Sequence, residues 1–281
     1  MPKIMVNGVG LYYEETGTGT PLLFLHEFAG DYASWEPQMR FFGRRYRAIT
    51  MSYRGYLPSD IPEDESLYSQ DILLDDVIGL MDALEIESAH ICGLSIGANS
   101  AVLMGLRVPE RCLSLTVAAG GHGSVEGAED RAEFVYDFSS RSDRLLEEGM
   151  EPVARQQAEK PNRVPMKTKD PRGWADFRDR LIAHSAVGSA YTARGVPLKR
   201  PSFYEIEVQL RDMTVPTLII VGDQDDNCLE GSMFLKRVLP CAGLHMFPMS
   251  GHLVNLEEPE LFNRSVQDFL STVELGRWIK P

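Results

Sequence analysis

Short apolar segments alternate with stretches of helical periodicity along most of this chain. Residues 22–25 are wholly apolar, which is typical of a strand buried on both faces. Further strands are predicted at residues 47–51, 88–94, 112–119, 217–221 and 244–247. Helices are predicted at residues 35–42, 68–84, 96–106, 229–238 and 259–273. This alternation indicates an α/β fold with a mostly parallel, doubly wound sheet and right-handed crossovers.

The alternation is lost between residues 122 and 213. This stretch is charged, contains several prolines, has no clear strand pattern and reads as mainly helical. Although 281 residues could make two domains, single α/β domains often reach this length. We therefore expect one α/β core formed by residues 1–121 and 214–281, with residues 122–213 inserted as a helical cap.

Two local signals concern the N-terminal part of the chain. Asn7-Gly8 lies between two short strand-like segments, and this dipeptide favours a type I′ hairpin. Ser34 precedes the helix predicted at residues 35–42, which carries Pro37 in its first turn, so Ser34 is predicted to be the N-cap of that helix.

A G-x-S-x-G motif joins the predicted strand at residues 88–94 to the helix that follows. Its residues are Gly93-Leu94-Ser95-Ile96-Gly97. A sharp strand–turn–helix connection holds a serine in a strained conformation, and the flanking glycines leave room for the turn. The following helix points its positive N-terminus toward developing negative charge. This context predicts a nucleophile elbow with Ser95 as the nucleophile.

A serine nucleophile requires a base, and His252 is the best placed of the six histidines. His252 follows the last predicted strand, so it can reach the sheet edge where Ser95 is expected. His90 and His245 fall within predicted strands and are interpreted as structural or surface residues. His122 and His184 belong to the insertion, where they either line a pocket or contribute polar surface.

The acid that orients the histidine is expected on the loop after residues 217–221. This loop contains Asp223, Asp225 and Asp226. We assign Asp225 to hold the imidazole in the correct tautomer. Asp223 and Asp226 are expected to cap the next helix or to face solvent.

The order Ser95, Asp225, His252 resembles that of the α/β-hydrolase family. The segment Gly222 to Asp225 is similar to the glycine–x–x–acid pattern that this family carries after its seventh strand. Gly251-His252, followed by Glu257-Glu258-Pro259, resembles the family's closing segment. The resemblance spans nearly the whole chain, apart from the detail of the insertion. It implies the α/β-hydrolase fold and a serine mechanism, and it does not specify a substrate.

Two segments depart from the family pattern. The resemblance implies an oxyanion hole formed by the backbone amides of Phe28 and Ile96, but Glu27 stands where relatives often have glycine. A bare carboxylate there would disfavour a developing oxyanion. Glu27 is therefore expected to be paired, with Arg54 as the suggested partner, or else to be a solvated loop acid. The segment at residues 52–60 lacks the leading aspartate and second glycine of its counterpart, and we interpret it as structural.

Net charge and the absence of certain motifs restrict the classes of partner and cofactor that we expect. The formal net charge of −13 disfavours nucleic acid and acidic membrane lipid as partners.

No apolar run is long enough for a membrane span, and no signal peptide is recognised. Four unpaired cysteines without C-x-x-C spacing fit a cytoplasmic protein. Metal-binding H-E-x-x-H, Walker and dinucleotide motifs are absent, so neither a metal nor an organic cofactor is expected. The oligomeric state is not indicated.

The cap is expected to set the substrate, a small or medium ester or lactone. Pocket candidates are Glu27, Trp174, His184, Arg194 and Tyr204, although most cap aromatic residues are expected to attach the cap to the core. Hydrolysis of a carbon–carbon bond in a diketone-like compound uses the same triad and remains an alternative. Leu253 after His252 counts against it, because ring-cleavage-product hydrolases of this fold are expected to have tryptophan there. A ligand-binding, receptor-like protein with little turnover is a second alternative.

Overall fold

The computed structural model describes residues 3–124 and 127–278. An eight-stranded sheet forms its centre, in the order β1-β2-β4-β3-β5-β6-β7-β8. The strands are β1 (Lys3–Val6), β2 (Val9–Thr16), β3 (Pro21–Leu25), β4 (Arg47–Met51), β5 (Ala89–Leu94), β6 (Cys112–Ala118), β7 (Thr217–Gly222) and β8 (Ala242–Phe247). The β1–β2 and β2–β4 pairs are antiparallel, and all other pairs are parallel. The predicted fold class is therefore confirmed.

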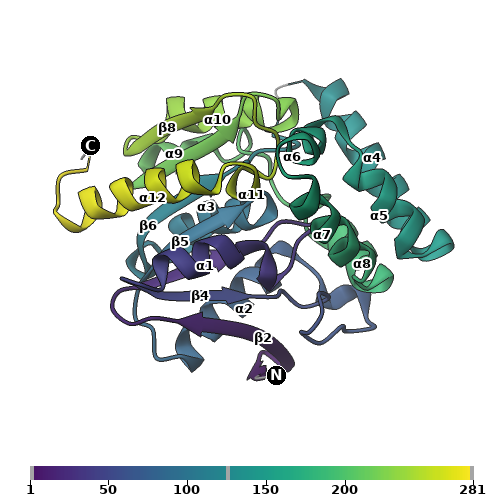
Figure 1. The fold of residues 1–281 in the computed structure, drawn as a ribbon, viewed down its shortest axis with the longest axis horizontal. Helices are drawn as coiled ribbons and strands as arrows, with labels where there is room; N and C mark the ends of the chain where they lie inside the picture. Colours follow the sequence, from purple (N-terminus) through teal and green to yellow (C-terminus); the bar gives the residue numbers. More distant parts are fainter. Residues whose placement is uncertain (1–2, 125–126, 279–281) are drawn as a thin grey trace.

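Helices cover both faces of this sheet. On one face lie α1 (Glu36–Phe42), α11 (Val254–Glu257) and α12 (Pro259–Glu274), and on the other lie α2 (Gln70–Ala83), α3 (Ile96–Arg107) and α10 (Asp226–Val238). The short helix α9 (Glu207–Asp212) packs beside α10 (Figure 1). Side chains of the central strands alternate between two apolar clusters: in β3, Leu23 joins one cluster and Phe24 the other. Burial on both faces explains why residues 22–25 are wholly apolar.

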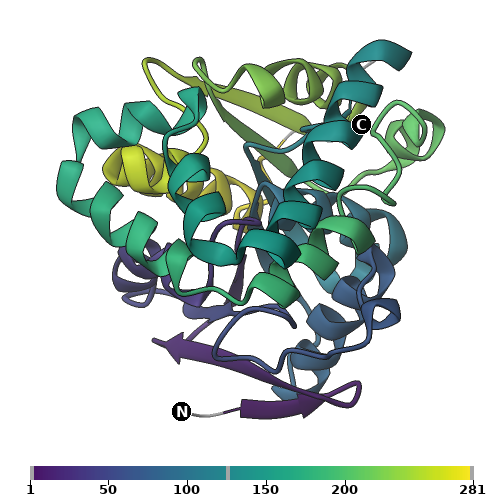
Figure 2. The ribbon, with the colours of Figure 1, turned by 90° about the vertical axis from the view of Figure 1, so that its right-hand side faces the viewer.

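In the described part of the chain, six α-helices lie between β6 and β7, and α9 is the last of them. The five before it are α4 (Ala128–Glu148), α5 (Met150–Ala158), α6 (Val164–Lys169), α7 (Pro171–Ile182) and α8 (Ala186–Gly195). They stack at one side of the sheet in Figure 1, and in Figure 2, which views the molecule from that side, they lie in front of it. None of the helices in residues 3–124 and 127–278 is both long and apolar enough to cross a membrane.

The two N-terminal predictions had different outcomes. Asn7 and Gly8 have φ angles of 49° and 80°, as a type I′ turn requires, and Val6 pairs with Val9. The prediction that Ser34 is a helix N-cap is wrong. Asp31 caps a 3-10 turn, η1 (Tyr32–Trp35), and Ser34 Oγ accepts a hydrogen bond from the Asp31 amide in a capping box. Helix α1 begins only after this turn.

Candidate active site

Ser95 occupies a tight turn between β5 and α3. Its φ angle is 56°, in the left-handed region, and its amide donates to the Ala118 carbonyl at 2.9 Å. A Cβ added to Gly93 would lie 2.0 Å from the Gly97 carbonyl oxygen, and one added to Gly97 would lie 2.1 Å from the Leu25 carbonyl oxygen. Only glycine fits at both positions, so the strained serine is maintained by close packing of β3, β5 and α3.

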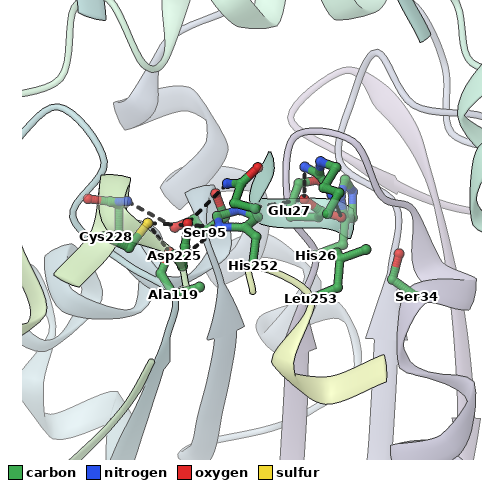
Figure 3. A network of polar contacts seen from close by, with 12 residues as sticks. His26, Glu27, Ser34, Ser95, Ala119, Asp225, Cys228, His252 and Leu253 are labelled. Carbon is green, nitrogen blue, oxygen red and sulfur yellow. Dashed lines mark hydrogen bonds and ion pairs between the residues drawn. The ribbon is translucent and has the colours of Figure 1, made fainter. Parts of the chain in front are cut away.

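His252 and Asp225 meet across the loops that follow β8 and β7. The distance between His252 Nδ1 and Asp225 Oδ2 is 2.7 Å, and both side chains are buried. The loops approach closely enough that a Cβ on Gly222 would lie 2.2 Å from the Ser250 carbonyl oxygen. Asp225 therefore holds the imidazole with Nδ1 toward the acid, which leaves Nε2 facing the Ser95 side of the site. Figure 3 shows Ser95, Asp225 and His252 gathered at this edge of the sheet.

The buried ion pair shifts the pKa values of both groups. Burial alone would lower the pKa of His252, but the charge of Asp225 and its hydrogen bond outweigh burial, and the pKa is raised above its ordinary value. Burial alone would raise the pKa of Asp225, but the charge of His252 together with the hydrogen bonds from His252, Asn162 and Cys228 outweighs burial, and the pKa is lowered. The arrangement therefore stabilises the imidazolium that forms when a serine proton is taken up.

Asn162, in the helical segment between β6 and β7, fixes this pair. It lies in the 3-10 turn η4 (Pro161–Arg163), where its side-chain amide donates to Asp225 Oδ1 at 3.0 Å and its carbonyl accepts from the His252 amide at 2.8 Å. Its role was not predicted from the sequence, because no local pattern links a polar residue in a helical insertion to a loop more than sixty positions away.

Glu257 holds the His252 loop from the other side. Its carboxylate accepts hydrogen bonds from the Gly251 amide at 2.7 Å and the Leu253 amide at 3.0 Å. The two bonds bracket His252 in the chain. Burial raises the pKa of Glu257. The family-like segment at residues 251–259 therefore has a physical function in this chain, which is to fix the backbone that carries the histidine.

Glu27 is paired, but the suggested partner Arg54 is wrong. Glu27 is buried and binds Arg163 of η4, with Oε2 2.8 Å from Nη2. Arg54 instead binds Asp76 of α2 through Nε at 2.6 Å and Nη2 at 2.7 Å. Burial would raise the pKa of Glu27, but the charge and hydrogen bond of Arg163 together with the charge of His252 outweigh burial and lower the pKa. The carboxylate therefore stays ionised and is neutralised by Arg163, a cation from the helical segment between β6 and β7.

The ionised Glu27 also faces the histidine. Its Oε2 lies 3.7 Å from His252 Nε2. Among the described residues, Ser95 Oγ makes no hydrogen bond. Catalytic hydrogen bonds are often long before substrate binds. His252 Nε2 is therefore close to an ionised carboxylate, in a cavity that Ser95 also lines.

The amides of Phe28 and Ile96 are available as donors. Among the described residues, neither makes a hydrogen bond. Ile96 is the first residue of α3, so its amide also carries the partial positive charge of the helix N-terminus.

A small cavity joins these groups. It has a volume of about 30 Å³ and is lined by Ser95, His252, Glu27, Phe28, His122, Phe138, Arg141, Gln157, Lys160, Asn162, Arg163 and Asn227. That volume has room for about one water molecule. A larger hollow of about 570 Å³ shares His122, Lys160 and Asn227 with it and leads outward along α4.

Of the five predicted pocket residues, only Glu27 lines this cavity. Trp174 donates to the Ala158 carbonyl at 3.1 Å, His184 faces Asp31 at 3.7 Å, Arg194 binds Asp143 at 2.7 Å, and the Tyr204 ring stacks 3.9 Å from that of Phe234. These four residues join cap elements to one another or to the core. The lining residues Phe134, Phe138 and Arg141 share one face of α4, a spacing that could have indicated an inward-facing stripe.

Within the described residues, Asp225, Cys228 and His252 are the one group whose potential metal ligands lie together, within 4.8 Å of one another. The contacts among them already account for this proximity. Cys228 Sγ donates to the Ala119 carbonyl at 3.2 Å, and burial raises the pKa of its thiol well above the ordinary value.

Comparisons with known proteins agree with this architecture. A family model described as the alpha/beta hydrolase fold matches residues 20–259. The chain is 27% identical over 256 residues to 3-oxoadipate enol-lactonase 1 of Acinetobacter baylyi, covering 90% of this chain and 89% of that protein. It is 27% identical to 2-hydroxymuconate semialdehyde hydrolase of a Pseudomonas strain, covering 97% of this chain and 94% of that protein. The crystal structure of the enol-lactonase from Burkholderia xenovorans superposes with a TM-score of 0.83 at 23% identity, covering 96% of this chain and all of that one.

Proposed function

The chain belongs to the α/β-hydrolase fold family, and we propose that it hydrolyses carboxylic esters or lactones of small or medium size, with Ser95 as nucleophile, His252 as base and Asp225 as the orienting acid. The observation that carries the proposal is the 2.7 Å contact between His252 Nδ1 and Asp225, in a cavity that also contains Ser95. The similarity to an enol-lactonase supports ester or lactone cleavage.

The mechanism follows from the positions of these groups. Ser95 Oγ attacks the carbonyl carbon and its proton passes to His252 Nε2, while the amides of Phe28 and Ile96 hold the oxyanion. The carbon–oxygen bond to the leaving group then breaks, and His252 returns the proton to the departing oxygen. A water molecule attacks the acyl-enzyme with His252 again as base, which releases the acid and restores Ser95.

We assign residues 122–213 the role of a cap and residues 1–121 and 214–281 that of the catalytic core, noting that residues 125 and 126 lie outside the described residues. The 30 Å³ cavity holds about one water molecule, so any ester requires the cap side chains to move. The adjoining hollow of about 570 Å³ offers the entry side. The four cysteines are free and buried, which supports a cytoplasmic location as part of the proposal.

Hydrolysis of a carbon–carbon bond is the second candidate. Its support is the similarity to 2-hydroxymuconate semialdehyde hydrolase over nearly the whole chain. The same serine and histidine would act on a ketone carbon: the carbon–carbon bond breaks, its electron pair leaves with the departing fragment as a carbanion stabilised by the neighbouring carbonyl, and this carbon then takes up a proton. An assay with a vinylogous diketone separates it from ester cleavage, since only a carbon–carbon hydrolase consumes that compound at a rate comparable with esters.

The proposal is tested by labelling and turnover on the purified full chain. A fluorophosphonate probe is expected to label Ser95, and a panel of 4-nitrophenyl esters to be hydrolysed by the native protein and not by Ser95→Ala. The matched control is Ser271→Ala on α12, a serine that contacts Arg45 far from the cavity. Labelling elsewhere, or equal turnover by Ser95→Ala, refutes the serine mechanism. Tight ligand binding without turnover would favour a receptor-like protein.

A further inference from the structure

Three basic side chains line the cavity that contains Ser95. Arg141 comes from α4, Lys160 immediately precedes η4, and Arg163 lies within η4. Arg141 and Arg163 are buried, and Lys160 is half-buried. Three cations around a cavity of about 30 Å³ are unusual, because each loses hydration there and must be compensated by a nearby anion.

The compensation inside the protein is incomplete. Arg163 is matched by Glu27. Arg141 and Lys160, however, share a single carboxylate: Arg141 Nη2 donates to Asp137, and Lys160 Nζ lies 3.1 Å from Oδ2 of the same residue. Two cations against one carboxylate leave one positive charge.

No other group at the cavity wall cancels this charge. Burial lowers the pKa of His122 to about 3, so its imidazole is neutral. His252 is paired with Asp225. The remaining polar residues that line the cavity are Ser95 and the neutral amides Gln157, Asn162 and Asn227. Glu133, Asp226 and Glu230 line the larger neighbouring hollow and are not among the residues around Ser95.

Arg141 also has unused hydrogen-bonding capacity. Among the described residues, it donates only through Nη2, to Asp137. Its guanidinium packs on the Phe138 ring at 4.3 Å from the centroid and on the Phe28 ring at 5.8 Å, which fixes its plane. Burial lowers the pKa of both Arg141 and Lys160, so a bound anion would relieve an unfavourable charge.

We propose that the substrate is an ester or lactone that carries its own carboxylate, which binds between Arg141 and Lys160 while the carbonyl lies at Ser95. This inference rests on the proposed hydrolase function and specifies its substrate class. A monoanion matches the single uncompensated charge, whereas a phosphate dianion exceeds it. A planar guanidinium held by two rings suits the planar, two-oxygen geometry of a carboxylate.

The test compares two esters of equal chain length. 4-Nitrophenyl hemiglutarate ends in a carboxylate, and 4-nitrophenyl pentanoate ends in a methyl group. The spontaneous rate is measured with Ser95→Ala protein and subtracted. We expect kcat/KM for the hemiglutarate to exceed that for the pentanoate by about 10- to 100-fold, the range for hydrogen bonds to a charged group.

Variants assign the preference to specific residues. Arg141→Gln and Lys160→Gln are each expected to reduce the ratio of the two kcat/KM values by about tenfold or more. The ratio cancels any general loss of activity. The matched control is Arg155→Gln, an exposed arginine on α5 that pairs with Glu151 away from the cavity, and it is expected to keep the native ratio.

A measurement on the native protein covers the case in which Arg141→Gln does not fold. Butyrate is expected to inhibit pentanoate hydrolysis at least about tenfold more strongly than butyramide, because only butyrate carries the charge. Serine-dependent turnover with a ratio near one, and equal inhibition by both compounds, would overturn the carboxylate site while leaving the hydrolase function intact. Failure of both esters together with failure of Ser95 labelling would overturn the proposed function itself.

Discussion

The buried Glu27–Arg163 pair is the most informative position for a mutation, because it joins the core to the cap beside the histidine. Arg163 Nη2 and Nη1 lie 2.8 Å and 3.3 Å from the two carboxylate oxygens, and each side chain is at most 4% exposed. Glu27→Gln would leave the Arg163 guanidinium buried without a counter-charge and close to Arg141 and Lys160. Breaking a buried pair in this way costs about 3–5 kcal/mol of unfolding free energy.

A double-mutant cycle measures this coupling. Glu27→Gln, Arg163→Gln and the double variant are unfolded with urea at pH 7 and followed by circular dichroism. Each single change is expected to cost about 3–5 kcal/mol, and the double variant less than the sum, because it leaves no unpaired charge. The exposed Glu151–Arg155 pair is the control, with a coupling below about 1 kcal/mol. Additive single effects at Glu27 and Arg163 would refute the reasoning.

The same variant tests the electrostatics of the base. Glu27 lies 3.7 Å from His252 Nε2 and raises the pKa of His252, whereas Arg163 lowers it. His252 must be neutral to take the serine proton, so the acid limb of kcat/KM follows its pKa. Glu27→Gln is therefore expected to move that limb to lower pH, and Arg163→Gln to move it to higher pH. Unchanged pH profiles in both variants would mean that Glu27 has no function at the site.

Three further predictions concern the parts that hold the site together. Asp225→Asn is expected to lower kcat by about 10⁴-fold in a steady-state assay, with an unchanged circular dichroism spectrum, because the imidazole loses the partner that sets its tautomer. Glu257→Gln is expected to lower kcat/KM by about 10- to 100-fold, because the His252 loop loses its anchor. Gly93→Ala is expected to yield no folded protein on size exclusion, since its Cβ would lie 2.0 Å from a carbonyl oxygen.

The strands and the serine turn could be predicted because their determinants are local. A strand buried on both faces appears in the sequence as a short run of apolar residues. The nucleophile elbow requires glycine at Gly93 and Gly97, which lie within one short segment. The closeness of His252 and Asp225 follows from topology, since loops after parallel neighbouring strands meet at one edge.

The cap contacts could not be predicted because they depend on how helices dock. Arg54 was the partner suggested for Glu27, yet its guanidinium binds Asp76 of α2. Arg163 reaches Glu27 from 136 positions away. Trp174 and Tyr204 have the residue types expected of a pocket wall, but helix packing directs them toward other contacts.

Within residues 160–163 of the cap, Asn162 and Arg163 make contacts that differ from those of Lys160. At Asn162 and Arg163, the cap is tied to Asp225, His252 and Glu27 by hydrogen bonds of 2.8 to 3.0 Å. Displacing η4 would break these bonds together and expose a buried ion pair, so it would disorganise the histidine at the moment a substrate enters. Lys160, by contrast, borders the larger hollow, and among the described residues its Nζ bonds only to Asp137 of α4. Widening that preserves the His252–Asp225 geometry must therefore take place on the α4 side, where a carboxylate of the substrate would bind Lys160 and Arg141 in addition to Asp137.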